Sequence, residues 1–406
     1  MTHEHDSLVS RSEAVTAVLD VRSVASPRRE QTSLDVTDRI TGRELAEPIT
    51  APSDVPAHDH ATMDGYAFDA TNAYPLEIRD SEVFPEDEPP QIAAGEAVSI
   101  ATGAPLPDRA NAVLKVEEAS VSDGELTGTD ISPGTYTYEQ GSSVTAGETL
   151  FEVGDHLSAK DLLLLRDLGI EEVVVRRPFS AGLLATGSEI HDGKTTDLDS
   201  PMLAELLRSW GHEANVAGTV PDEFERTKDA ISTLAEDHDV VISTGGTSVG
   251  KHDYVIRALD ALGDVIFHRV GIRPGKPIAL ARLDDYDAVA FAVPGKPIGA
   301  HTVATLVMRP FFRGERSNIP TITATMSATV DIGTAGFEYA IPVTVDGDRA
   351  VPLGHSTSPL DVYEETFDPS VLSSTTRASR ADGFVLTEGT LNAGQSVCVV
   401  PYEVLE

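Results

Sequence analysis

The sequence is poor in several residue types, and each shortage limits what the protein can do. Its 406 residues include one cysteine, Cys398, and only seven lysines. A single cysteine can form neither an internal disulfide nor a thiolate metal cluster, so we expect a cytoplasmic protein. The first residues lack a basic segment followed by an apolar one, and no run approaches the roughly 18 apolar residues of a membrane span. We therefore expect neither a signal peptide nor a membrane-embedded segment.

Positive charge is scarce as well. The chain contains 66 Asp and Glu residues against 30 Lys and Arg residues, which gives a formal charge of -36. Because such a surface repels polyanions, we expect no nucleic-acid partner and no contact with an anionic membrane. The same balance favours a halophilic protein, since molar salt screens the self-repulsion of the acidic surface.

The length and the segment patterns indicate several domains. At the usual size of about 100 to 200 residues per domain, the chain is expected to form two to four. Residues 12–26 have the pattern of a helix, and residues 46–145, rich in Pro, Gly, Asp and Thr, predict an inserted β-rich domain. Ser158 then caps a predicted helix that ends at Gly169 and leads into the strand EEVVVRR.

The segment 179–314 alternates between strand and helix patterns. The predicted strands are AGLLA at 181–185, HEANVAGTV at 212–220, DVVIST at 239–244, DVIFHRV at 264–270, PIALARL at 277–283 and DAVAFAV at 287–293. The predicted helices are PMLAELLRSWG at 201–211, DEFERTKDAISTLAEDH at 222–238, HDYVIRALDALG at 252–263 and PIGAHTVATLVMRPFF at 297–312. This alternation predicts a doubly wound, mostly parallel α/β sheet covered on both faces. After Arg316, short alternating segments predict a small all-β domain, either a sandwich or a barrel.

Glycine-rich loops follow the strands of this predicted sheet. Ligands of open α/β sheets bind outside the carboxyl ends of the strands. The loops there are TGSE at 186–189, TGGTSVGKHD at 244–253, RPGKP at 273–277 and PGKP at 294–297. They hold Arg273 and three of the seven lysines, Lys251, Lys276 and Lys296. This predicts a site for an anionic ligand. The alternative, that the glycines only form turns, leaves the lysines unexplained.

One of these loops resembles a nucleotide-binding motif. The residues from Gly245 to Lys251 fit G-x-x-x-x-G-K, but a P-loop needs Ser or Thr after the lysine to ligate Mg²⁺, and the chain has His252. A P-loop NTPase is therefore disfavoured.

Two acidic residues in these loops suggest a cation site. Glu189 and Asp253 follow different strands and are expected to face one crevice, where they could bind a divalent cation together with a ligand phosphate. The alternative is a helix cap for Asp253 and a solvated carboxylate for Glu189.

The inserted region contributes its own polar residues. His58 and His60 lack a third ligand at metal-binding spacing, which favours ordinary loop histidines. A turn at Asp64 is expected to point a carboxylate into a cleft, and Thr102 supplies a hydroxyl in another turn.

Taken together, these motifs resemble the molybdopterin molybdenumtransferase family, which includes MoeA and the E domain of gephyrin. The resembling segments, in order, are DVPAHDHATMDGYA at 54–67, ATGAPLP at 101–107, ATGSEI at 185–190, DSPMLAELL at 199–207, STGGTSVGKHDY at 243–254, GIRPGKPIA at 271–279 and PGKPIGA at 294–300.

The resemblance implies a cytoplasmic homodimer of four-domain chains. The elongated N-terminal domain would comprise residues 10–50 and 146–178, and the inserted β-rich domain residues 51–145. Residues 179–314 would form the α/β molybdopterin-binding domain, and residues 315–406 a small β-barrel. The implied reaction is the Mg²⁺-dependent insertion of molybdate into adenylylated molybdopterin, with release of AMP. Contact with other molybdenum-cofactor enzymes is implied too.

The resemblance also implies roles for individual residues. The expected catalytic residues are Glu189, Asp253, Asp64 and Lys276, of which Glu189 and Asp253 would also be the metal ligands. The expected substrate-binding residues are Thr102, Thr186, Thr244, Gly245, Gly246, Ser248, Arg273, Lys276, Pro294, Gly295 and Lys296. The catalytic residue Asp64 and the substrate-binding residue Thr102 would close the cleft from the second domain.

Several positions depart from the family pattern. Ser143 stands where the family has a carboxylate, Lys296 and Gly299 where it has an amide and a hydroxyl, and Gly336 and Ile341 where it has arginines. The expected Asn after Asp197 is Asp199. These departures leave a second hypothesis open, in which the protein carries molybdopterin or its metallated product without turning it over.

Overall fold

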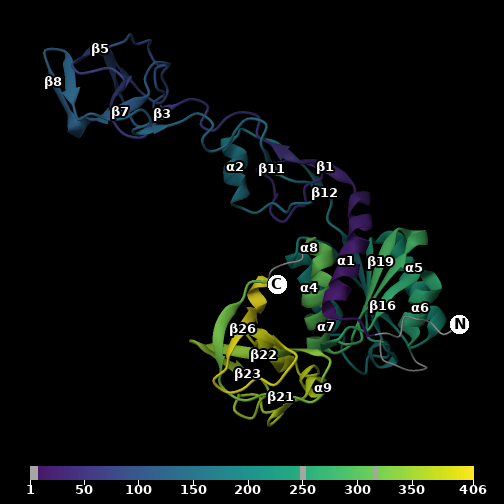
Figure 1. Ribbon diagram of the computed structural model, residues 1–406. Helices are drawn as coiled ribbons and strands as arrows, with labels where there is room; N and C mark the ends of the chain where they lie inside the picture. Colours follow the sequence, from purple (N-terminus) through teal and green to yellow (C-terminus); the bar gives the residue numbers. More distant parts are fainter. Residues whose placement is uncertain (1–7, 247–252, 315–318) are drawn as a thin grey trace. The chain divides into compact units, whose positions relative to one another are not determined.

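The computed structural model describes residues 8–246, 253–314 and 319–406, and the chain divides into two compact units (Figure 1). The first unit contains the N-terminal residues up to Thr32 and Arg176–Glu406, and the second contains Ser33–Val175. The boundaries of the four domains implied by the resemblance stay predictions. Within the described residues, no helix combines the length and the apolar character needed to cross a membrane.

A six-stranded sheet forms the centre of the first unit. In spatial order its strands are β14 (Glu213–Val220), β13 (Ser180–Thr186), β15 (Val240–Thr244), β19 (Ala288–Val293), β18 (Ala279–Leu283) and β16 (Asp264–His268). The first four are parallel to one another, and β18 is antiparallel to both of its neighbours. The predicted doubly wound, mostly parallel sheet is confirmed.

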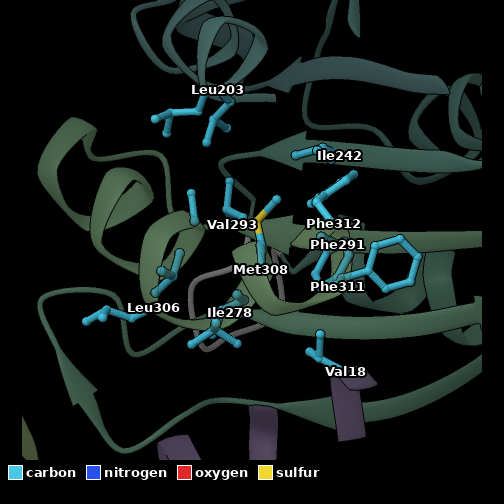
Figure 2. Packing of buried hydrophobic residues seen from close by; sticks show 14 of the residues in the cluster. Val18, Leu203, Ile242, Ile278, Phe291, Val293, Leu306, Met308, Phe311 and Phe312 are labelled. Carbon is cyan, nitrogen blue, oxygen red and sulfur yellow. The ribbon is translucent and has the colours of Figure 1, made fainter. Parts of the chain in front are cut away.

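Helices cover both faces of this sheet (Figure 1). They are α1 (Arg11–Ala25), α3 (Ser188–His191), α4 (Asp199–Ser209), α5 (Phe224–Asp237), α6 (Tyr254–Leu262), α7 (Pro297–Val303) and α8 (Arg309–Arg313). Alternate residues of the central strand β15 lie on opposite faces of the sheet. Ile242 packs in the core beneath α1, α4 and α8, whereas Val241 packs in the core beneath α5 and α6. Figure 2 shows the first of these cores, which contains Val18, Leu203, Ile242 and Phe311.

The predicted helix over 297–312 is present but interrupted. A π-helical segment, Ala304–Met308, separates α7 from α8. Pro310 has no N–H to donate in the first turn of α8, which favours a change of hydrogen-bonding pattern here.

The C-terminal region closes into a five-stranded barrel. Its strands, in spatial order, are β22 (Glu338–Asp346), β23 (Arg349–Pro352), β20 (Ile322–Met326), β26 (Ser396–Pro401) and β25 (Gly383–Thr387). The barrel closes because β25 also pairs with β22. Of the two predicted alternatives, the structure forms the barrel. Shorter elements beside it are β21 (Asp331–Ile332), β24 (Thr366–Phe367) and α9 (Pro369–Leu372).

One connection between the α/β region and the barrel is not evident from the sequence. The RPGKP segment at 273–277 is predicted to be a loop, but its first residue belongs to strand β17 (Ile272–Arg273), which pairs in parallel with the start of β22. A two-residue strand has too few positions to give an alternating pattern, so its sequence carries no strand signal.

The second unit is rich in short strands, as predicted. One sheet, in spatial order, contains β7 (Ala112–Lys115), β4 (Gly65–Phe68), β6 (Glu96–Ile100), β5 (Leu76–Val83), β9 (Glu125–Gly128) and β8 (Ala119–Ser122). The remaining pairs are β1 (Gln31–Asp35) with β12 (Glu172–Arg176), β2 (Ile49–Thr50) with β11 (Thr149–Phe151), and β3 (His60–Ala61) with β10 (Thr137–Tyr138). The helix predicted after Ser158 is α2 (Asp161–Asp167), but the predicted cap is wrong, because the N-cap residue is Lys160, whose side chain makes no capping hydrogen bond. The backbone N–H and the hydroxyl of Ser158 both donate to Asp161 instead.

Candidate active site

Three loops meet at the carboxyl ends of the adjacent parallel strands β13, β15 and β19. Thr186 ends β13, and its hydroxyl donates a hydrogen bond of 2.9 Å to the carbonyl oxygen of Thr244, the last residue of β15. The N–H of Gly245 donates to the carbonyl oxygen of Val293 at the end of β19, at 3.1 Å. The residues predicted to line one edge of the sheet therefore lie side by side there.

The glycines in these loops allow the backbones to approach closely. Gly245 has φ +80°, and a Cβ at this position would lie 2.6 Å from the carbonyl oxygen of Thr186. A Cβ on Gly295 would lie 3.0 Å from the Cα of Gly245. Gly246 also has a positive φ, and its added Cβ would collide with Val255 of α6. Only glycine fits at such positions. The predicted site residue Ser248, like Lys251, lies outside the described residues.

Glu189 carries an open carboxylate beside these loops. It lies in the short helix α3, and its side chain is exposed. Its carboxylate oxygens fold back over Gly187, at 3.0 and 3.2 Å from the position that a Cβ on this glycine would take. Within the described residues, no side chain or backbone donor bonds this carboxylate, so it is available to a ligand.

Asp253 has a different environment. It is the N-cap of α6, where one carboxylate oxygen accepts a hydrogen bond of 3.2 Å from the N–H of Ile256, and the other lies 3.9 Å from Nε2 of His268. The side chain is only 8% exposed, and this burial raises the pKa of Asp253 to about 6, against the opposing effects of the Ile256 hydrogen bond and the nearby Arg269. The helix cap, one of the two interpretations open from the sequence, is realised. Nowhere in the described residues do three His, Cys, Asp or Glu side chains gather to hold a metal ion, so the metal pair stays a prediction.

A buried carboxyl group that the site prediction omitted lies at the start of α4. Asp199 is 6% exposed, and its Oδ1 has no hydrogen-bond partner among the described residues. Burial, with a smaller effect from the charge of Asp197, raises the pKa of Asp199 to about 6. Asp197 itself accepts hydrogen bonds from the N–H groups of Asp199 and Ser200. The signal in the sequence was the aspartate at a position where the family has an amide.

Three cationic residues line a single cavity. The cavity has a volume of about 290 Å³, and it lies between the glycine-rich loops of the α/β region and helix α9 beside the barrel. Its lining residues are Arg273, Pro274, Gly275, Lys276, Pro277, Pro294, Lys296, Gly299, Pro369, Ser370 and Ser373. The Nζ of Lys296 donates a hydrogen bond of 2.8 Å to the carbonyl oxygen of Ser370. The predicted cations from two separate loops thus share one concave surface.

An aromatic ring that the sequence analysis missed contacts two of these cations. The Cζ of Arg273 lies 4.1 Å from the centroid of the Phe337 ring, and the Nζ of Lys276 lies 5.4 Å from it. Both distances are within the range of cation–π interactions. Phe337 follows Gly336, and the absence of the family's arginine at Gly336 was the only sequence signal near it.

Asp64 and Thr102 form a pair in the second unit. One carboxylate oxygen of Asp64 accepts hydrogen bonds from both the N–H and the hydroxyl of Thr102, each of 2.7 Å, and these bonds lower the pKa of Asp64. Both side chains are exposed. His60 belongs to strand β3 and not to a loop. Its ring nitrogen Nδ1 lies 3.3 Å from the carbonyl oxygen of His58, and the ring packs edge-on against Tyr138 of the paired strand β10.

The class of protein follows from these features. Glycine-rich loops at the carboxyl edge of a doubly wound sheet, beside a cationic cavity, are typical of a protein that binds an anionic small molecule. Residues 9–169 match the family model described as the MoeA N-terminal region (domain I and II), and residues 182–314 match the one described as the probable molybdopterin binding domain.

Individual relatives agree with these matches. The chain is 30% identical over 307 residues to the molybdopterin molybdenumtransferase of Synechococcus elongatus, covering 70% of this chain and 75% of that one. It is 28% identical over 380 residues to the protein of the same name from Haemophilus influenzae, covering 89% and 91%. A solved structure described as the molybdopterin biosynthesis MoeA protein from Pyrococcus horikosii superimposes with a TM-score of 0.73 at 27% identity, covering 98% of this chain and 99% of that one. The chain belongs to the molybdopterin molybdenumtransferase family, which the sequence motifs had suggested.

Proposed function

We propose that this protein acts in molybdenum cofactor biosynthesis as a molybdopterin molybdenumtransferase, which inserts molybdate into adenylylated molybdopterin and releases AMP. Family membership supports the reaction class. The observation that carries the proposal for this chain is the cavity that Arg273, Lys276 and Lys296 share. In a chain with a formal charge of -36, three cations around one cavity are a local exception, and they would concentrate an anion there.

In this proposal, the cavity binds molybdate or the substrate phosphate. The guanidinium of Arg273 can donate two parallel hydrogen bonds to an oxyanion, whereas the ammonium groups of Lys276 and Lys296 act as point charges. Because these cations are already in place, they would stabilise negative charge that develops as the phosphoanhydride is cleaved. Lys276 is the residue we assign to this catalytic role.

The glycine-rich loops would hold the pterin and its phosphate. Thr186, Thr244, Gly245 and Gly246 lie at the carboxyl edge of the sheet. The Thr186 hydroxyl and the Gly245 N–H hold the loops together, and the other backbone N–H groups and hydroxyls of these loops would cradle the anion. Pro294 and Gly295 complete the same edge and lead directly to Lys296. Ser248 is predicted to take part.

The residues fit a magnesium ion in one specific manner. Mg²⁺ is commonly held by one or two carboxylates together with substrate phosphates and water. The open carboxylate of Glu189 suits this role, whereas Asp253 offers one oxygen, because the other caps α6. When bound with the substrate, the ion would neutralise phosphate charge.

Further elements of the proposal come from the family resemblance. Asp64 and Thr102 would close the cleft within a homodimer, in the cytoplasm of a halophilic organism. The finished cofactor would pass to other molybdenum-cofactor enzymes.

One observation favours the carrier hypothesis as a second candidate. Ile341 stands where the family has an arginine, and its side chain is fully buried in the barrel core. Together with Gly336, this removes two cations that the family pattern includes. A carrier would bind the pterin and release no AMP.

The decisive experiment is AMP release from adenylylated molybdopterin by the purified protein in high salt with Mg²⁺, with and without molybdate. Molybdate-dependent release supports the transferase, and tight pterin binding without release supports the carrier. Glu189→Gln is expected to abolish turnover in a folded protein, with Asp192→Asn, an exposed carboxylate nearby, as the control. Full turnover by Glu189→Gln would refute the metal role of Glu189.

A further inference from the structure

Two of the cations that line the cavity contact an aromatic residue just before the first barrel strand. Phe337 is half-buried and packs against the barrel core, and its ring faces both Arg273 and Lys276. We propose that Phe337 is a positioning residue, which holds these two cations side by side to receive a tetrahedral oxyanion. The inference rests on the proposed function and names the residue that orders its anion site.

The backbone fixes the ring relative to the cations. Strand β17 pairs with β22 so that Ile272 is opposite Glu338 and Arg273 is opposite Tyr339, and the N–H of Glu338 donates a hydrogen bond of 2.8 Å to the carbonyl oxygen of Gly271. Phe337 directly precedes this paired segment. The pairing therefore fixes the position of the ring relative to the Arg273 loop, although the two belong to different regions of the chain.

The ring offsets the repulsion between the two cations. Two neighbouring cations repel each other, and a carboxylate placed between them would relieve that repulsion but would also compete with an incoming oxyanion. In the part of the chain that the structure describes, neither Arg273 nor Lys276 forms an ion pair with a carboxylate. The negative face of an aromatic ring attracts both cations without neutralising either of them.

The acidic side chain next to Phe337 is already paired with another cation. Glu338 is adjacent to Phe337, but its carboxylate accepts two hydrogen bonds from Arg11, of 2.5 and 3.0 Å. The residues around Phe337 thus hold the cations in place and leave their charge available. Because long cationic side chains lose rotamer freedom when they bind, ordering them beforehand strengthens binding.

The proposal is tested by titrating molybdate alone into the purified full-length protein by calorimetry, in the KCl concentration at which the protein is folded. Phe337→Leu is expected to weaken binding about three- to tenfold, the range typical of a lost cation–π contact. Phe337→Tyr is expected to retain the wild-type Kd. Phe84→Leu removes a phenylalanine that is 42% exposed and lies in the second unit, so it serves as the matched control.

A second variant separates ring electrostatics from packing. Pentafluorophenylalanine at position 337 keeps the shape of the ring but removes its negative face, so the fold is preserved while molybdate binding should weaken as in Phe337→Leu. In turnover, the KM for molybdate should rise while kcat stays within twofold. Wild-type affinity in both variants would overturn the inference alone, because the anion site would still be present. If the wild-type protein and Arg273→Ala both failed to bind molybdate, the result would refute the proposed anion site and this inference together.

Discussion

Arg11 and Glu338 form a two-point ion pair that joins the start of helix α1 to the first residue of barrel strand β22, although 327 positions separate them in the sequence. The same part of the chain makes backbone contacts with the Arg273 loop. Val9 forms a parallel bridge with Val270, and the N–H of Gly271 donates a hydrogen bond of 2.7 Å to the carbonyl oxygen of Val9. The N-terminal segment therefore secures the backbone that leads into the anion site.

Removal of Arg11 should release an acidic competitor into this region. The two side chains are partly exposed, so the ion pair is expected to contribute only about 0 to 1 kcal/mol to stability. In Arg11→Ala, the free carboxylate of Glu338 should weaken molybdate binding, as measured by calorimetry, while the thermal unfolding midpoint changes little. The double variant Arg11→Ala/Glu338→Gln should recover the wild-type affinity. Equal weakening in the single and double variants would show instead that Arg11 acts through packing.

Asp199 should make stability depend on pH. Its pKa is raised from 3.8 to about 6 in the folded protein, which corresponds to about 3 kcal/mol of destabilisation by the charged form. The folded state holds this proton more tightly than the unfolded state, so the penalty is absent below about pH 4 and complete above about pH 6. Asp199→Asn should therefore raise the free energy of unfolding by about 2 to 3 kcal/mol at pH 8, with the gain shrinking as the pH falls towards 4.

Denaturant unfolding at several pH values measures this effect. Asp20→Asn, at an exposed position of α1, removes the same formal charge and serves as the control, with an expected change within about 0.5 kcal/mol. A gain in Asp199→Asn that did not vary with pH would show that the charged carboxylate is not the cause.

The contact between Gly245 and Thr186 predicts a substitution that the loop cannot accept. Gly245→Ala meets a backbone oxygen at 2.6 Å in addition to the cost of a positive φ. Gly193, in the same unit, has a similar φ of +71°, and in Gly193→Ala no atom of the described residues lies within 4 Å of the new Cβ. Gly193→Ala should cost only the backbone penalty of about 1 to 2 kcal/mol, and Gly245→Ala should cost more. Equal losses in denaturant unfolding would mean that the Thr186 loop moves aside.

Local patterns in the sequence predicted most of the fold. Strand Ala288–Val293 is a continuous apolar run, and Val240–Thr244 begins with three apolar residues, because both faces of the sheet are covered. The helices between the strands have regular spacing and recognisable ends. The convergence of the glycine loops followed from the rule that ligands bind at the carboxyl edge of such sheets.

The features that could not be predicted depend on contacts between distant segments. The pairing of Ile272–Arg273 with β22 involves too few residues to leave a pattern, and the position of Phe337 over the cations follows from that pairing. The choice between sandwich and barrel depended on the pairing of β22 with β25. Asp253 was ambiguous because an aspartate before a helix serves equally as a cap or as a ligand, and only its burial and its bond to Ile256 distinguish the two.

The formal charge of -36 predicts that salt controls stability. The Debye length falls from about 10 Å at 0.1 M salt to about 3 Å at 1 M, so high salt should remove most of the repulsion between surface carboxylates. The midpoint of thermal unfolding should rise by about 10 °C or more between 0.1 and 2 M KCl, and protein unfolded in dilute buffer should refold on dialysis into high salt. Sucrose at matched osmolality is the control, because it lacks the ions needed for screening. A midpoint that sucrose raised as much as KCl would show that general solute exclusion, and not charge screening, stabilises the fold.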